Sequence, residues 1–130
     1  MDKLAEFLRQ RRELAARYDA MLRGLPLILP WQHPDGLSAW HLYVVRPDAA
    51  KTQVTRAQMY EGLRARGIAP QVHYIPVHTQ PWYQGLGFQP GDFPEAEAYY
   101  SGALSLPMFA SLSHQDQDQV VAALREILCT

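Results

Sequence analysis

The first 24 residues constrain the fold most, because they form the longest segment of the chain with a single periodicity. Between residues 2 and 24 apolar side chains recur every three or four positions, which predicts an amphipathic helix. Asp2 is placed to cap its start and Gly24 to end it. Such a helix must pack its apolar stripe against another element, part of which we expect to be missing from this chain. The stripe comprises Leu4, Phe7 or Leu8, Arg11, Leu14 or Ala15, Tyr18, Met21 or Leu22, and Leu25, whereas the opposite face, predicted to be solvated, carries Arg9, Gln10, Arg12, Glu13, Arg17 and Asp19.

Three further segments show the periodicity of strands. Residues 37–46 carry apolar side chains on both faces, which is typical of a central strand and makes His41 a buried core histidine. Residues 68–75 and 103–106 are predicted to be shorter strands, each ended by a proline. Three prolines make residues 26–36 an extended connector.

Capping residues predict three more helices. Thr55 and Gln58 occupy capping-box positions before a helix that ends at Gly67. Acidic residues begin a helix between residues 92 and 102, and Ser113 caps a last helix with a strongly apolar face. The order of elements predicts an α+β fold, in which a sheet of about three strands is covered by helices and preceded by the long N-terminal helix.

Composition limits the class of protein. A chain of 130 residues and 14.8 kDa predicts one domain, residues 1–130. Its 12 basic and 13 acidic residues provide no positive field for a nucleic-acid partner. No apolar run is long enough to cross a membrane, and the lone Cys129 indicates a reducing compartment. We therefore expect a cytoplasmic protein without nucleic-acid or membrane partners.

Residues 73–83 concentrate two imidazoles, two phenols, an amide and an indole. Such groups suit a polyhydroxylated or aromatic ligand, because rings stack on sugar faces and polar tips bond to hydroxyls. The prolines and glycines of residues 76–91 equally fit a rigid loop whose aromatic side chains seal the edge of the core. The residues leave both interpretations open, and both require an ordered loop.

Other kinds of site find less support in the sequence. His73 and His78 are five residues apart with a proline between them, which does not match a helical zinc motif, so no metal site is predicted. Cys129 has no neighbouring base to activate it as a nucleophile. Glu95 and Glu97 suit the positive end of a helix better than acid-base chemistry.

The residues also carry a family resemblance. The segment VHYIPVHTQPWYQGLGFQPGDFPEAEAYY, followed by SLPMF and the terminal helix, resembles the C-terminal small domain of the DegT/StrS family of pyridoxal-phosphate-dependent nucleotide-sugar aminotransferases. LAEFLRQRRELAARYDAML is similar to the helix that links the two domains, and SAWHLYVVR to the first small-domain strand. ILPWQHPDGLSAWHLYVV and HYIPVH are most similar to the subgroup that makes UDP-4-amino-4,6-dideoxy sugars on the route to pseudaminic acid.

The resemblance implies a small domain of the fold-type-I class, with residues 1–25 as the linking helix and residues 26–130 as the α+β part. It implies that His73 lies near the substrate side of the cofactor cleft, and that Tyr74 and His78, from the same motif, are further candidates for binding the sugar nucleotide. The resemblance also implies that the family's catalytic residues belong to the large domain, so none is expected in this chain.

The resemblance makes pyridoxal phosphate the cofactor of the full-length enzyme, with none expected on this chain alone. Its two lysines, Lys3 and Lys51, lack the desolvated surroundings that a Schiff-base amine requires. We therefore expect a fragment or truncated reading frame, inactive by itself, whose partners are the missing large domain, a nucleotide-sugar substrate and a possible second copy. The alternative is a stand-alone module that binds a small molecule or a protein through residues 73–83.

Overall fold

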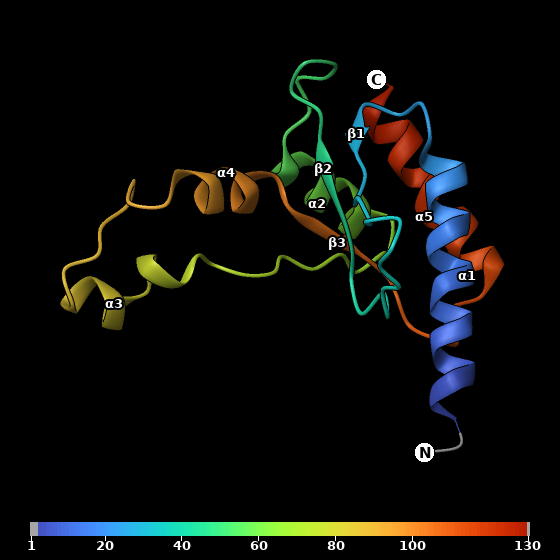
Figure 1. Cartoon of the computed structure of the whole chain (residues 1–130). Helices are drawn as coiled ribbons and strands as arrows, with labels where there is room; N and C mark the ends of the chain where they lie inside the picture. The colour runs from blue at the N-terminus through green and yellow to red at the C-terminus, as the bar shows by residue number, and fades with distance from the viewer. Residues whose placement is uncertain (1–2, 130) are drawn as a thin grey trace.

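The structure, a computed structural model, describes residues 3–129 (Figure 1). The predicted cap Asp2 lies outside the described residues, and Lys3 occupies the N-cap position without a side-chain hydrogen bond. In chain order the elements are α1 (Leu4–Leu22), β1 (Leu27–Ile28), β2 (Tyr43–Pro47), α2 (Arg56–Ala65), the short 3-10 helix η1 (Val77–Thr79), α3 (Pro81–Gly85), α4 (Pro94–Gly102), β3 (Leu104–Leu106) and α5 (His114–Leu128).

The sheet has three strands in the order β1-β2-β3, and both pairings are antiparallel. This confirms the predicted α+β class and the number of strands, but not their identity. β1 lies within the predicted connector and pairs Leu27 with Pro47. The predicted strand over residues 68–75 is wrong, because only a single bridge, between Gln71 and Ser105, joins that segment to β3.

The predicted strand over residues 37–46 begins later than expected, at Tyr43. Trp40 has a φ of 48°, which no regular strand accommodates. Arg11 fixes this stretch by donating to the carbonyl oxygens of Trp40 and His41, both at 3.0 Å. His41 is exposed and precedes the strand, so its interpretation as a core histidine is wrong.

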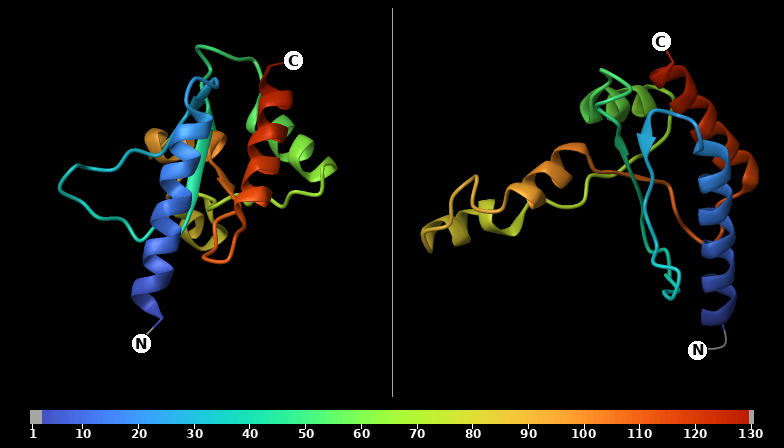
Figure 2. Two further views of the ribbon diagram at one scale, coloured as in Figure 1. Left: turned by 90° about the vertical axis from the view of Figure 1, so that its right-hand side faces the viewer. Right: turned by 45° about the horizontal axis from the view of Figure 1, so that its top comes forward.

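The core lies between one face of the sheet and helices α1, α2 and α5 (Figure 2). Tyr43 on β2 stacks on Tyr18 of α1, with ring centroids 4.9 Å apart. Both phenols are satisfied despite burial, because Tyr43 donates to Asp19 and Tyr18 donates to the carbonyl of Pro107. Burial raises the pKa of both phenols, which keeps them neutral donors.

The polar side of α1 is only partly solvated, which corrects the predicted surface. Arg9 pairs with Glu6 and Glu13 in the open, as expected. Arg17 instead reaches α5 and pairs with Asp118 at 2.7 Å, with 26% of its side chain exposed. α1 and α5 are therefore joined by charge as well as by apolar packing.

Local signals at the helix ends are confirmed. Thr55 and Gln58 form the complete capping box of α2, and Gly67, just beyond its end, has a φ of 76°. The Ser113 side chain accepts from the backbone of Asp116 at the start of α5. The interior glycine Gly62 marks the point where α2 approaches α5, because a Cβ there would lie 2.8 Å from a side-chain carbon of Ile127.

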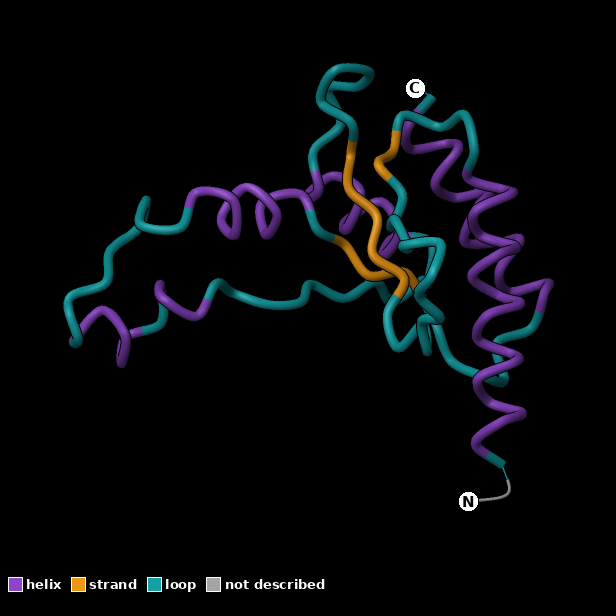
Figure 3. The backbone as a smooth tube through the Cα atoms, in the orientation of Figure 1, coloured by secondary structure: helices purple, strands orange, loops and turns teal. Residues whose placement is uncertain are grey.

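Residues 73–102 form an arm that projects from the rest of the structure (Figures 1 and 2). An outgoing limb carries η1 and α3, and the chain returns through α4 to β3; much of the outgoing limb is loop (Figure 3). Within residues 73–102, all of which are described, His78 is the only buried residue. The arm therefore has almost no core of its own. The solvent-exposed fraction is 75% for Trp82 and 73% for Tyr74.

Candidate functional site

His73 is the first residue of the arm, at the point where the chain leaves the sheet; we call this point the root of the arm. The two backbone hydrogen bonds between Gln71 and Ser105, at 2.8 and 3.0 Å, fix this point against β3. Nδ1 of His73 then lies 2.9 Å from Oγ of Ser105, whose residue is only 3% exposed. The buried hydroxyl sets the orientation of a half-buried imidazole, so His73 stands on a rigid support.

Tyr74 accompanies His73 at the root of the arm. Its ring packs against the imidazole, with centroids 4.7 Å apart, and its side chain is largely exposed. The structure therefore brings these two predicted residues together. An imidazole held from behind and a neighbouring exposed phenol can both form hydrogen bonds with a hydroxyl-rich or phosphate-bearing ligand.

The structure places His78 inside the arm, apart from His73 and Tyr74. Its Nε2 lies 2.8 Å from Oε1 of Glu97, and its ring packs on Phe93 at 4.8 Å between centroids. The same carboxylate oxygen accepts from the backbone N–H of Gly91 at 2.6 Å. Glu97, on the returning limb, is thus bonded to the outgoing limb through His78, so this histidine holds the arm together.

Hydrogen bonding favours the ionised form of Glu97. The backbone N–H of Gly91, followed by the His78 imidazole, holds the pKa of this carboxyl below its ordinary value. Glu97 is in the first turn of α4, as predicted, but its carboxylate has specific partners that the helix-end interpretation missed. Only a folded arm could reveal them, because His78 and Glu97 are 19 residues apart.

The loop over residues 76–91 is ordered and contains two short helices that the sequence did not predict, η1 and α3. Tyr83, Phe88 and Phe93 form a row of tilted ring contacts, at 6.3 and 6.0 Å between centroids. Gln84 donates to the carbonyl of Thr79 at 3.0 Å. Trp82 is outside this row and is exposed.

Neither lysine resembles a cofactor-binding amine. Lys51 pairs with Asp48 at 2.7 Å and exposes 65% of its side chain, and Lys3 is exposed at the start of α1. A Schiff-base lysine needs a desolvated amine, which neither an exposed nor an ion-paired side chain provides. The described residues therefore do not fit the lysine role that pyridoxal phosphate requires, and no catalytic step through that cofactor is assigned to them.

Within residues 3–129 no three His, Cys, Asp or Glu side chains are grouped as metal ligands. His33 and His114 are exposed, and His33 accepts from the backbone N–H of Asp35. No helix in the described part of the chain has the length and apolar character needed to span a bilayer.

The fold matches about a third of the chain of solved sugar aminotransferases. Residues 1–125 match the DegT/DnrJ/EryC1/StrS aminotransferase family, and the chain belongs to that family. The spore coat polysaccharide biosynthesis protein SpsC of Bacillus subtilis is 42% identical over 98% of this chain, which covers 34% of that protein.

Solved structures agree with this assignment. DesV of S. venezuelae, solved in complex with a ketimine intermediate, superposes with a TM-score of 0.87 at 36% identity, over 96% of this chain and 33% of that one. The Helicobacter pylori aminotransferase PseC, involved in pseudoaminic acid biosynthesis, gives a TM-score of 0.82 at 27% identity, over 98% of this chain and 34% of that one. The chain thus spans about a third of the length of the proteins it matches.

Proposed function

We propose that this chain forms one wall of the substrate cleft of a pyridoxal-phosphate-dependent aminotransferase that aminates a nucleotide-linked keto sugar. The observation that carries the proposal is the family match over residues 1–125. The chain covers only about a third of the length of its relative SpsC, so the rest of such an enzyme would lie outside it. The amino donor, by resemblance, is glutamate. The Schiff-base lysine and the cofactor site would come from a separate large domain, and the chain alone would be inactive.

His73 is the proposed substrate-binding residue. Its imidazole is fixed by Ser105 at 2.9 Å and lies beside the exposed ring of Tyr74. A pre-oriented ring loses little entropy when it forms a hydrogen bond with a sugar hydroxyl or a phosphate oxygen. Tyr74 can contact the same ligand directly, whereas His78 supports it by holding the arm in shape.

The test uses complementation. The chain would be mixed with a separately expressed large domain of a relative such as SpsC, and amination of a UDP-4-keto sugar by glutamate measured. We expect activity from the mixture alone, reduced at least about tenfold by His73→Ala because a pre-organised hydrogen bond is lost. His33→Ala is the matched control, since His33 is exposed and distant in the chain. A stoichiometric borohydride-trapped adduct at Lys3 or Lys51, with turnover by the chain alone, would contradict the proposal.

The finer assignments follow from sequence resemblance. We assign the substrate to the UDP-4-amino-4,6-dideoxy-sugar subgroup of pseudaminic acid synthesis, and the similarity to PseC supports this choice. A panel of UDP- and dTDP-linked keto sugars in the complementation assay would test it. A homodimer and a cytoplasmic location belong to the same proposal.

A stand-alone binding module is the second candidate, favoured by the exposed aromatic side chains of the arm. It predicts that UDP-sugars bind tightly to the chain without a large domain and change the emission of Trp82. The cleft-wall proposal predicts weak binding by the isolated chain and tight binding only in the mixture. Fluorescence titration of both samples therefore separates the two functions.

A further inference from the structure

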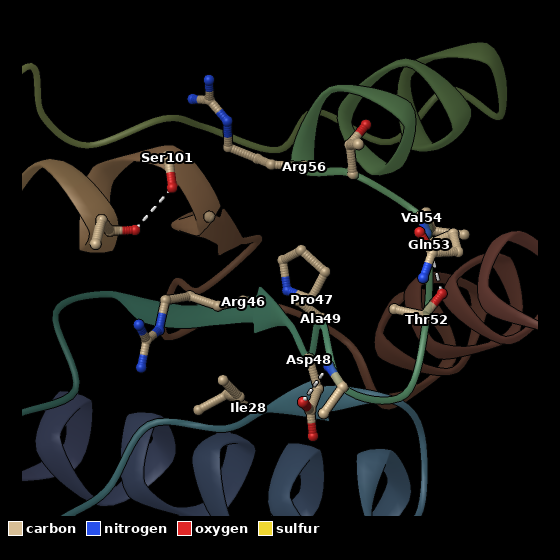
Figure 4. Close-up of a pocket in the computed structure, with 14 residues that line it drawn as sticks. Ile28, Arg46, Pro47, Asp48, Ala49, Thr52, Gln53, Val54, Arg56 and Ser101 are labelled. Carbon is tan, nitrogen blue, oxygen red and sulfur yellow. Dashed lines mark hydrogen bonds between the residues drawn. The ribbon is translucent and has the colours of Figure 1, made fainter.

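A cavity of about 590 Å³ lies between the loop that joins β2 to α2 and the end of α4 (Figure 4). This volume is in the range of small-molecule sites. The residues that line it include none of the three candidate binding residues, His73, Tyr74 and His78. The cavity is therefore separate from the proposed sugar-binding root of the arm, and its properties can be tested independently.

Two arginines on different elements flank the cavity. Arg46 is on β2, and Arg56 is the first residue of α2. Their Cζ atoms each lie 5.2 Å from the centroid of a tyrosine ring, Tyr99 for Arg46 and Tyr100 for Arg56. A guanidinium that lies over a ring is held in place, while its N–H donors at the edge stay able to bind an anion.

The Arg46 stem packs against the end of α4. A Cβ built on Gly102 would lie 3.5 Å from Cβ and 3.6 Å from Cγ of Arg46, so the stem packs along this turn. Both arginines are half-buried. Their positions are thus set by packing as well as by the ring contacts, which reduces the entropy that a ligand must overcome.

The charges around the cavity do not cancel. Elsewhere, Arg17 and Arg66 pair with carboxylates at 2.7 and 3.1 Å, but among residues 3–129 no ion pair involves Arg46 or Arg56. The lining carboxylate, Asp48, is neutralised by Lys51 at 2.7 Å. Two uncompensated positive charges therefore flank one cavity.

We propose that this cavity binds a small molecule bearing a diphosphate group, with Arg46 and Arg56 as its charged contacts. Arginine is suited to phosphate because its planar fork matches two oxygens at once. Two guanidiniums on separate elements favour a ligand with more than one anionic group. The hydroxyls of Thr52 and Ser101, also in the lining, add polar partners that can orient it.

The experiment titrates inorganic diphosphate into the 130-residue chain and follows the Nε–H resonances of the arginine side chains by NMR. We expect saturable shifts at Arg46 and Arg56, and an affinity about tenfold weaker in Arg46→Gln and in Arg56→Gln, because each loses a charge-assisted contact. Arg64→Gln is the matched control: Arg64 is exposed on α2, outside the cavity lining, and its loss removes the same charge. Unfolding midpoints would verify that each variant is folded.

Tyr99→Leu and Tyr100→Leu test whether stacking positions the arginines. Each is expected to weaken diphosphate binding several-fold, whereas the matching Tyr→Phe variants keep the ring and the affinity. Equal weakening by Arg64→Gln, shifts that do not saturate, or equal binding of succinate would overturn the inference. None of these outcomes depends on aminotransferase activity, so failure here leaves the proposed function untouched.

Discussion

Nδ1 of His73 lies 2.9 Å from Oγ of Ser105, which is almost completely buried on the central part of β3. This contact is held by the antiparallel bridge between Gln71 and Ser105, so backbone pairing and side-chain orientation are set by one strand residue. Ser105 is consequently a positioning residue: it orients the His73 imidazole and does not itself contact a ligand.

Ser105→Ala should release the His73 ring. Because the hydroxyl no longer bonds to Nδ1, we expect the imidazole nitrogens to change from one tautomer to a mixture, visible in their ¹⁵N chemical shifts. The free energy of unfolding should fall by only about 1 kcal/mol, the usual value of one hydrogen bond. Ser101→Ala removes an exposed hydroxyl from α4 and serves as the control. An unchanged tautomer in Ser105→Ala would show that Ser105 does not orient the ring.

Glu97 should make the stability of the arm depend on pH. Its pKa is held below the ordinary value of 4.5 in the folded chain, first by the Gly91 N–H and then by His78. The stabilisation is therefore fully present above the unfolded pKa and is lost as the pH falls through the folded pKa. Amide hydrogen exchange of Gly91 reports this locally: its protection factor, which compares its rate with that of an unstructured amide at the same pH, should fall in acid.

The variant Glu97→Gln tests the same contact at neutral pH. We expect Gly91 to lose protection, with no further loss in acid, because the ionised acceptor is gone. Glu95→Gln is the control: it is exposed in the same helical turn, and no bond to His78 or Gly91 is seen for it. Equal exchange rates at Gly91 in the native chain and in Glu97→Gln would contradict the hydrogen bond from the Gly91 N–H to this carboxylate.

Some parts of this structure could be predicted because their causes are local. The capping box at Thr55 and the cap at Ser113 involve residues three positions apart, so the sequence contains both partners. β1 has two residues and exists only because Pro47 and Arg46 lie opposite it, which no pattern within residues 26–36 reveals. Strand pairing is decided by the tertiary fold, and periodicity alone placed the second strand wrongly.

The candidate site was predictable only in part, for the same reason. His73 and Tyr74 stand out through the motif around them, whereas the role of Ser105 depends on a pairing across 32 residues. In the core, away from the candidate site, the burial of Gln117 had only an ambiguous signal in the sequence, because this polar residue lies one helical turn before the apolar residues of α5. In the structure it is fully buried and donates to the carbonyl of Leu14 at 2.8 Å.

Gly62→Ala should not give the stabilisation usual for this change in a helix. Alanine is ordinarily favoured by about 1 kcal/mol in a helix interior, but the new Cβ would lie 2.8 and 2.9 Å from Cδ1 and Cγ1 of Ile127. We expect crowding between α2 and α5 to lower the free energy of unfolding by about 1 kcal/mol instead.

A double-mutant cycle identifies the cause of that loss. Ile127→Ala removes both crowded atoms, so Gly62→Ala should become stabilising in that background, with a coupling of about 1–2 kcal/mol in urea unfolding. If Gly62→Ala has the same effect with Ile127 or Ala at position 127, the helices are not in tight contact at this glycine. The cycle measures the interhelical approach separately from helix propensity.

Arg11 should be the most costly arginine of α1 to replace. Its Nη1 donates to the carbonyl oxygens of Trp40, His41 and Met108 at 3.0, 3.0 and 3.3 Å, so one cation joins the helix to the start of β2 and to the segment after β3. Arg11→Met keeps an apolar stem but leaves these acceptors without their donor. We expect the free energy of unfolding to fall by about 2–3 kcal/mol.

Arg9→Met is the matched control on the same helix. Arg9 forms exposed pairs with Glu6 and Glu13, and its loss should change the free energy of unfolding far less than the loss of Arg11, because solvent screens such pairs. Urea unfolding of the two variants compares a cation that bonds backbone carbonyls with one that bonds solvated carboxylates. Equal losses would mean that the segment around Trp40 is held by packing rather than by Arg11, and the left-handed conformation of Trp40 would then need another support.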